Sequence, residues 1–95
     1  MPLFVISARD RADSLELRMA TREAHFAYVN AHPGFVRLGG PYLDEEGRMA
    51  GSLMVVECED LAAAERFHAG DPYKTAGLFE SSTVDPWKVT LGALA

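Results

Sequence analysis

Three basic side chains recur at helical spacing in the first third of the chain and could bind or activate a small ligand. Arg18, Arg22 and His25 are four and three residues apart, so on a helix they would lie next to one another. On a helical wheel of residues 14–31, apolar side chains flank this basic edge on both sides, and acidic and amide side chains face outward. Two guanidinium groups beside an imidazole suit an anionic or oxygen-rich small molecule. The alternative is that these are surface side chains whose long stems cover apolar neighbours.

Asp71 is the candidate partner of this basic edge, and it has two interpretations. Locally, Asp71-Pro72 predicts a helix start, because the carboxylate can accept from free backbone N–H groups and proline suits the first helical position. In the fold expected below, the loop that carries Asp71 lies near the last strand and could face the first helix. A carboxylate there would orient the imidazole of His25, as in general-base dyads. The sequence gives no role to His32 or His68.

The elements that position these residues follow from the hydrophobic pattern and from the Gly, Pro and Asp residues that mark turns and helix ends. The prediction is a strand at 2–8, a helix at 14–31, strands at 35–43 and 49–59, a helix at 60–69 capped by Asp60, a helical turn from 71 to about 78, and a strand at 81–91. The order β-α-β-β-α-β predicts an α+β, ferredoxin-like fold, with an antiparallel sheet and both helices on one face. No sequence remains to cover the other face, so we expect a homodimer that packs sheet against sheet as a dimeric α+β barrel.

Several local signals refine these elements. Asp13 and Glu16 form a capping-box-like pair at the start of the first helix, with Ser14 as a rival cap. The sequence Gly39-Gly40-Pro41 predicts either a bulge in the second strand or a place where the backbone approaches a ligand. Pro86 predicts an edge, a bulge or a bend in the last strand.

Composition restricts the class of protein and its partners. The chain has 95 residues, 48% of them hydrophobic and 24% charged, which predicts one globular domain over residues 1–95. Its net charge of −5 argues against nucleic acid and anionic membranes as partners. No apolar stretch approaches the roughly 20 residues of a membrane span, and no signal peptide is visible. The single cysteine, Cys58, fits a reducing compartment, so we expect a cytoplasmic protein.

The sequence predicts neither a metal nor a cofactor. The three histidines and one cysteine lack ligand spacings such as HxxxH or CxxC. The glycine pair at 39–40 precedes a proline rather than a helix, so it does not form a phosphate-binding loop. The expected partner is therefore a small molecule, most simply an anionic one.

Taken together, the motifs identify a family resemblance that covers nearly the whole chain. They are Asp13-Ser14-Leu15, Arg18, Arg22-x-x-His25, Gly40-Pro41, Gly51-Ser52, Asp71-Pro72-Tyr73 followed by Ala76-Gly77, and Pro86-Trp87-Lys88. In this order and spacing the chain resembles the YciI-like family of YCII-related domains. The resemblance implies a ferredoxin-like fold that dimerises through its sheets and a His–Asp site, carried here onto His25 and Asp71. Relatives of similar architecture include muconolactone-isomerase-type and dehydrochlorinase-type enzymes that act on small oxygenated rings.

Two main hypotheses for function follow, and a third is purely structural. The first is a small enzyme without a metal, in which His25 is general base or acid, Asp71 orients it, and the two arginines hold a carboxylate or enolate oxygen. Its reaction would be proton abstraction with isomerisation or elimination on a small anionic or phenolic compound. The second is a non-catalytic metabolite-binding or stress-linked domain, in which Asp71 is only a helix cap. The third treats the dimer as a scaffold with no pocket at the arginines.

Three further residues are candidate ligand contacts. Gly40 would bring its backbone close to the ligand, Ser52 could donate a hydrogen bond to it, and Tyr73 could form a wall of the pocket. Packing roles also explain Ser52 and Tyr73.

Overall fold

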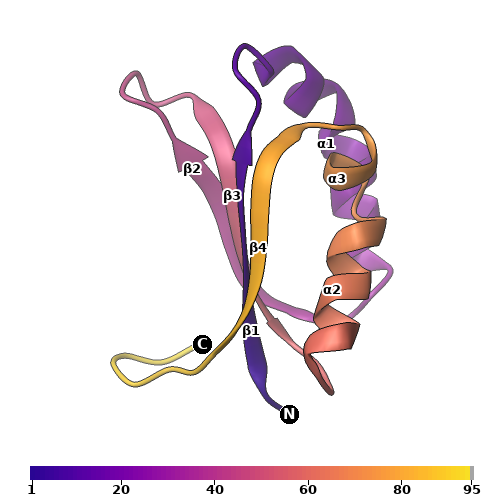
Figure 1. The fold of residues 1–95 in the computed structure, drawn as a ribbon, viewed down its shortest axis with the longest axis vertical. Helices are drawn as coiled ribbons and strands as arrows, with labels where there is room; N and C mark the ends of the chain where they lie inside the picture. Colours follow the sequence, from indigo (N-terminus) through magenta and orange to yellow (C-terminus); the bar gives the residue numbers. More distant parts are fainter. Residues whose placement is uncertain (95) are drawn as a thin grey trace.

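The fold is a four-stranded antiparallel sheet with helices on one face, in the predicted β-α-β-β-α-β order (Figure 1). We describe residues 1–94 from a computed structural model. The elements are β1 (Leu3–Asp10), α1 (Leu15–Asn30), β2 (Val36–Leu43), β3 (Met49–Glu57), α2 (Leu61–Gly70), α3 (Pro72–Thr75) and β4 (Phe79–Trp87). The strand order β2-β3-β1-β4 places the two central strands between two edge strands, which is the ferredoxin-like arrangement that the sequence predicts.

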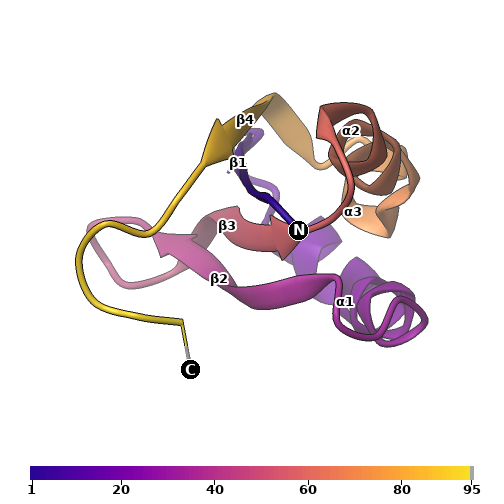
Figure 2. The same cartoon turned by 90° about the horizontal axis from the view of Figure 1, so that it is seen from below.

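Side chains on one face of the two central strands, β1 and β3, form the core. In β1, Phe4 and Ile6 are buried and pair with Val56 and Met54 of β3, so these four side chains share one face of the sheet. Phe67 from α2 packs against this cluster. Figure 2 shows all three helices on that side of the sheet and the C-terminal segment on the other. The opposite face carries Val5, Ser7 and Leu53, which are partly exposed, and Val55, which is buried.

The buried side chains of helix α1 are polar, although a helix that packs on a sheet normally buries apolar ones. The buried residues of this 16-residue helix are Arg18 and His25, whereas Leu15, Met19 and Phe26 are exposed. Two of the three residues of the basic edge, Arg18 and His25, therefore point inward, whereas Arg22 remains exposed. The physical reason is that a cavity, described below, lies between α1 and the sheet.

The predicted capping box at the start of α1 is wrong. Asp13 adopts a left-handed conformation with φ of 56°, outside the helix. Ser14 is the N-cap residue, but its hydroxyl donates to the carbonyl of Ala12 at 3.3 Å rather than accepting from the helix. In contrast, Asp60 caps α2 as predicted, because its side chain accepts from the backbone N–H of Ala63 at 2.9 Å.

The predicted bulge at the glycine pair is also wrong. From Leu38 to Tyr42, β2 pairs residue by residue with β3, and the register shifts lie on either side of that stretch. Gly39 and Gly40 therefore continue the ladder, which leaves the alternative prediction of a close approach to a ligand.

Strand boundaries differ from the prediction at both ends of the sheet. Strand β1 runs on to Asp10, because Arg9 still pairs with Gly51 and with Ser81. Strand β4 covers Phe79–Trp87 rather than 81–91, and it ends opposite Leu3, where β1 begins and a partner strand is no longer present. Within the described residues no helix is both long and apolar enough to cross a membrane.

Candidate functional site

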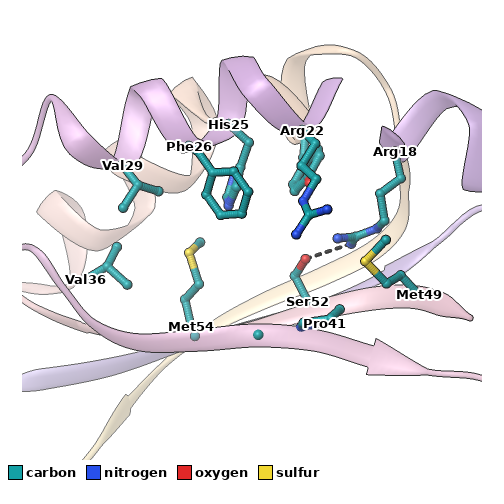
Figure 3. A pocket seen from close by; sticks show the side chains of 13 residues that line it. Arg18, Arg22, His25, Phe26, Val29, Val36, Pro41, Met49, Ser52 and Met54 are labelled. Atoms are coloured by element: carbon teal, nitrogen blue, oxygen red, sulfur yellow. Dashed lines mark hydrogen bonds between the residues drawn. The ribbon is translucent and has the colours of Figure 1, made fainter. Parts of the chain in front are cut away.

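A cavity of about 240 Å³ lies between α1 and the strands β2 and β3 (Figure 3). One part of its wall is apolar and the other carries nitrogen and oxygen groups. The apolar and backbone lining comes from Phe26, Val29, Val36, Gly39, Gly40, Pro41, Met49 and Met54, and the polar lining from Arg18, Arg22, His25, Ser52 and Tyr73. This cavity is large enough for a small ring compound, with polar groups gathered near one end.

His25 and Asp71 form a buried pair in the wall of the cavity. Nδ1 of His25 lies 2.8 Å from Oδ1 of Asp71, although the two residues are 46 positions apart in the sequence. Asp71 is fully buried and His25 nearly so. The carboxylate can only accept, so Nδ1 carries the proton in this contact. Nε2 is then the nitrogen left to exchange a proton with a molecule in the cavity.

Asp71 is also the cap of α3, so both predicted geometries occur at once. Its Oδ1 accepts from the backbone N–H of Tyr73 at 2.9 Å, and Pro72 occupies the first turn. Its other oxygen, Oδ2, is buried without a hydrogen-bond partner among residues 1–94, as is Nδ1 of His68. A charged carboxylate with one unpartnered buried oxygen is costly to keep, which is typical of a functional position.

The ring of Tyr73 packs flat against the imidazole of His25. The ring centroids are 4.2 Å apart and the planes are 16° from parallel. The guanidinium of Arg18 lies 4.6 Å from the same phenol ring. Burial raises the pKa of Tyr73, and the charges of Arg18 and Arg22 oppose this. The phenol is therefore neutral near pH 7 and can act as a hydrogen-bond donor at the cavity wall.

Arg18 is a paired charge, and its partner is a residue that the sequence did not identify. Its Nε and Nη2 donate to the two carboxylate oxygens of Asp10 at 2.7 and 3.1 Å. Its Nη2 also donates to Oγ of Ser52 at 2.7 Å, the contact dashed in Figure 3. The signal that could have found Asp10 is topological, because it ends the central strand β1 just before the chain turns back into α1.

Arg22 differs from Arg18 in its surroundings. It is exposed at the mouth of the cavity and has no carboxylate within ion-pair distance in the described part of the chain. Its guanidinium lies 5.3 Å from the ring of Phe26. A ligand oxyanion could therefore bind Arg22 without displacing another partner.

Gly40 contributes to the cavity through its backbone. It pairs with Leu53, whereas Gly39 and Pro41 pair with Met54 and Ser52, whose side chains reach the cavity. An added methyl group at Gly40 would meet nothing within 4 Å, but one at Gly39 would lie 3.0 Å from Met54 Cγ. The absence of a side chain at Gly39 thus keeps this part of the cavity open, whereas the residue predicted from the sequence to approach a ligand is Gly40.

No metal site accompanies this cavity within residues 1–94, since no three His, Cys, Asp or Glu side chains gather where they could hold an ion. The other histidines have structural contacts. His32 bonds to the carbonyl of Tyr28 through Nδ1 at 2.8 Å, and His68 bonds to Oγ of Ser82 through Nε2 at 2.9 Å.

Several known proteins resemble this chain. The family model of the YCII-related domain matches residues 2–88. Protein YciI of Escherichia coli is 36% identical over 94 residues, covering 90% of this chain and 96% of that protein. The solved structure of 5-chloro-2-hydroxyhydroquinone dehydrochlorinase from Burkholderia phenoliruptrix, in complex with 2,5-dihydroxybenzoquinone, is 34% identical with a TM-score of 0.82 and covers 90% of this chain and 93% of its own. An antibiotic biosynthesis monooxygenase at 11% identity and a TM-score of 0.58 covers 96% of this chain and 100% of its own, and it shares the fold alone.

Proposed function

The chain belongs to the YCII-related domain family, and from this premise we propose that it is a small enzyme in which His25 transfers a proton and Asp71 orients it. The reaction class is proton abstraction with elimination or isomerisation on a small anionic or phenolic ring compound. The observation that carries the proposal is the 2.8 Å contact between Nδ1 of His25 and Oδ1 of Asp71 in the wall of a ring-sized cavity.

The proposed chemistry uses the free nitrogen of His25. Nε2 takes a proton from an O–H or C–H group of the substrate, and the buried carboxylate of Asp71 stabilises the imidazolium that forms. The electron pair left on the substrate then forms a new double bond. In an elimination, the leaving group departs with its own bonding pair; in an isomerisation, Nε2 returns the proton to another atom. Arg22 is placed to stabilise the developing oxyanion.

Elimination is the better supported of these two outcomes. The similar solved structure, at 34% identity, is that of a dehydrochlorinase acting on a chlorinated hydroxyhydroquinone. The apolar wall formed by Phe26, Val29 and Met54 would accept the ring of such a compound, and the polar end would accept its oxygens.

The test is turnover of chlorinated and hydroxylated benzenes by wild type and His25→Gln, followed by chloride release and ultraviolet absorbance. His25→Gln keeps a polar side chain but cannot transfer the proton, so we expect turnover to fall by about 100-fold or more. Glu23→Gln is the matched control, because Glu23 is an exposed residue of the same helix. Wild-type turnover in His25→Gln would refute the proposal.

A binding domain without catalysis is the second candidate, and one observation favours it. The bond from the Tyr73 N–H to Oδ1 of Asp71 explains this aspartate as a helix cap with no chemistry. A binding domain predicts saturable ligand binding without product, and equal binding by Asp71→Asn and wild type. A product that depends on His25 would exclude it.

We also infer that a second copy of the chain covers the free face of the sheet. Leu38 and Trp87 are exposed there, and Val5 and Leu53 are only partly buried. A domain this small rarely leaves such a face in water. Sedimentation equilibrium should give twice the chain mass, and Leu38→Glu should shift it toward the monomer. A monomeric wild type would exclude this dimer.

A further inference from the structure

The charge of Arg18 is already neutralised inside the protein. Its guanidinium contacts both carboxylate oxygens of Asp10, and the side chains of the two residues are 3% and 5% exposed. A bidentate pair that is this well shielded from water stays closed, because separating it would leave two buried charges unpaired. Arg18 therefore offers the cavity hydrogen-bonding surface but no net positive charge.

The same pair determines which way the hydroxyl of Ser52 points. Nη2 of Arg18 donates to Oγ of Ser52 at 2.7 Å, so one lone pair of this oxygen is occupied. The hydroxyl hydrogen is then free to be donated, and Ser52 lines the cavity with only 8% of its surface exposed. Ser52 is thus prepared to donate to a ligand oxygen, and it brings no charge of its own.

The remaining charges at the cavity nearly cancel. Arg22 has no carboxylate partner among the described residues, whereas Asp71 places a carboxylate directly behind the imidazole of His25. One ligand oxyanion would find a partner in Arg22. A second negative charge on the ligand would find no further unpaired guanidinium among the described residues that line the cavity, and the carboxylate of Asp71 would repel it.

We propose that this cavity selects singly charged ring compounds over doubly charged ones, with the oxyanion on Arg22 and a neighbouring uncharged oxygen on Ser52. Asp10 determines this selectivity by neutralising Arg18, so it acts as a specificity-determining residue without touching the ligand. The inference rests on the proposed location of the substrate site, and it adds the charge that the substrate carries and the residue that enforces it.

Benzoate and phthalate are matched probes, since they share a ring and differ by one carboxylate. We expect wild type to bind benzoate about tenfold or more tightly than phthalate, measured by calorimetry at low ionic strength, where exposed charges are least screened. Asp10→Asn frees the charge of Arg18 and should raise the affinity for phthalate relative to benzoate by about tenfold. Equal affinities in wild type, an unchanged ratio in Asp10→Asn, or no binding of either probe at millimolar concentration would each overturn the proposal.

Two further variants keep the test sharp if Asp10→Asn does not fold. Arg22→Gln removes an exposed side chain, which should leave the fold intact, and it should weaken benzoate binding about tenfold or more. Wild-type affinity in Arg22→Gln would overturn the proposal by itself. The double variant Asp10→Asn/Arg18→Gln is uncharged at this pair and should restore the wild-type ratio.

These binding measurements are independent of turnover. Selective binding of benzoate by a protein with no activity would support the charge selectivity and refute the proposed catalysis. Turnover that depends on His25, together with equal binding of both probes, would support the proposed catalysis and refute the charge selectivity.

Discussion

Replacing Asp71 by asparagine should separate the two tasks of this residue, because asparagine has nearly the same shape but no charge. Oδ1 of Asp71 accepts both from Nδ1 of His25 and from the N–H of Tyr73. An amide oxygen can occupy this position and accept both bonds. The amide nitrogen would then replace Oδ2, which has no partner in the described chain and lies on the same turn as the equally unpartnered Nδ1 of His68.

The expected stability change is small for Asp71→Asn and large for Asp71→Ala. Alanine removes the α3 cap, which contributes about 1 kcal/mol, and leaves the buried Nδ1–H of His25 without an acceptor, at about 1–3 kcal/mol. We expect the free energy of unfolding to fall by about 2–4 kcal/mol in Asp71→Ala. In Asp71→Asn, the neutral amide forms weaker hydrogen bonds, which lowers the free energy of unfolding. The variant also removes a buried charge with one unpartnered oxygen, which raises it. Because the two effects oppose each other, we expect a net change within about 1 kcal/mol.

Urea unfolding of the two variants measures these changes in the free energy of unfolding, provided that the m-values are equal. Turnover measures the second task of Asp71, the support of the His25 imidazole. Asp71→Asn should lose about 100-fold or more in rate, because the imidazolium of His25 loses its counter-charge. A loss of only about 1 kcal/mol in Asp71→Ala would show that Asp71 is merely a cap. Equal instability of both variants would refute the idea that a neutral amide can replace the carboxylate in the fold.

Three other predictions concern the scaffold. Gly51→Ala should lower the free energy of unfolding by about 1–3 kcal/mol, because its methyl carbon would lie 2.5 Å from a carbonyl oxygen of β1. Gly40→Ala, whose methyl would meet nothing within 4 Å, should unfold at nearly the wild-type urea concentration; a large loss there would contradict the assigned register. Burial, and then the charge of Lys74, lower the pKa of His68 below 6.5, against the opposing charge of Asp71. As the pH falls below 6.5, the unfolded chain binds a proton at His68 that the folded protein does not, so the free energy of unfolding declines. In His68→Phe the free energy of unfolding should therefore change less between about pH 7 and 5. A slope equal to that of wild type would refute this.

The fold was predictable because the residues that begin and end helices and strands agreed with the hydrophobic pattern between them. Asp60 and Asp71 mark the starts of two helices, and runs of apolar residues mark the central strands β1 and β3. The predictions made from short local motifs failed at the start of α1 and at the end of β4. Asp13 adopts a left-handed turn instead of capping α1. The last strand stops at Trp87 because the neighbouring strand begins at Leu3, which a local pattern cannot reveal.

The site was predictable in part, for a different physical reason. The spacing of Arg18, Arg22 and His25 on one helix was readable from the sequence, and so was a capping role for Asp71. The pairing of Arg18 with Asp10 was not, because it depends on where the end of a strand meets a helix in space. The wheel could not show that Arg18 and His25 are the buried residues of α1, since apolar side chains normally take that position.

The shared oxygen of Asp71 links the integrity of the site to the local opening of one short element. Helix α3 has four residues, too few to persist without its cap and the packing of Tyr73. When α3 frays, the Tyr73 N–H leaves Oδ1 and the phenol ring leaves His25, so the imidazole loses its support in the same event. The hydrogen-exchange rate of the single Tyr73 amide is therefore a direct reporter of how often the site is assembled. A ligand held against Tyr73 and His25 would slow that exchange even if no product ever formed.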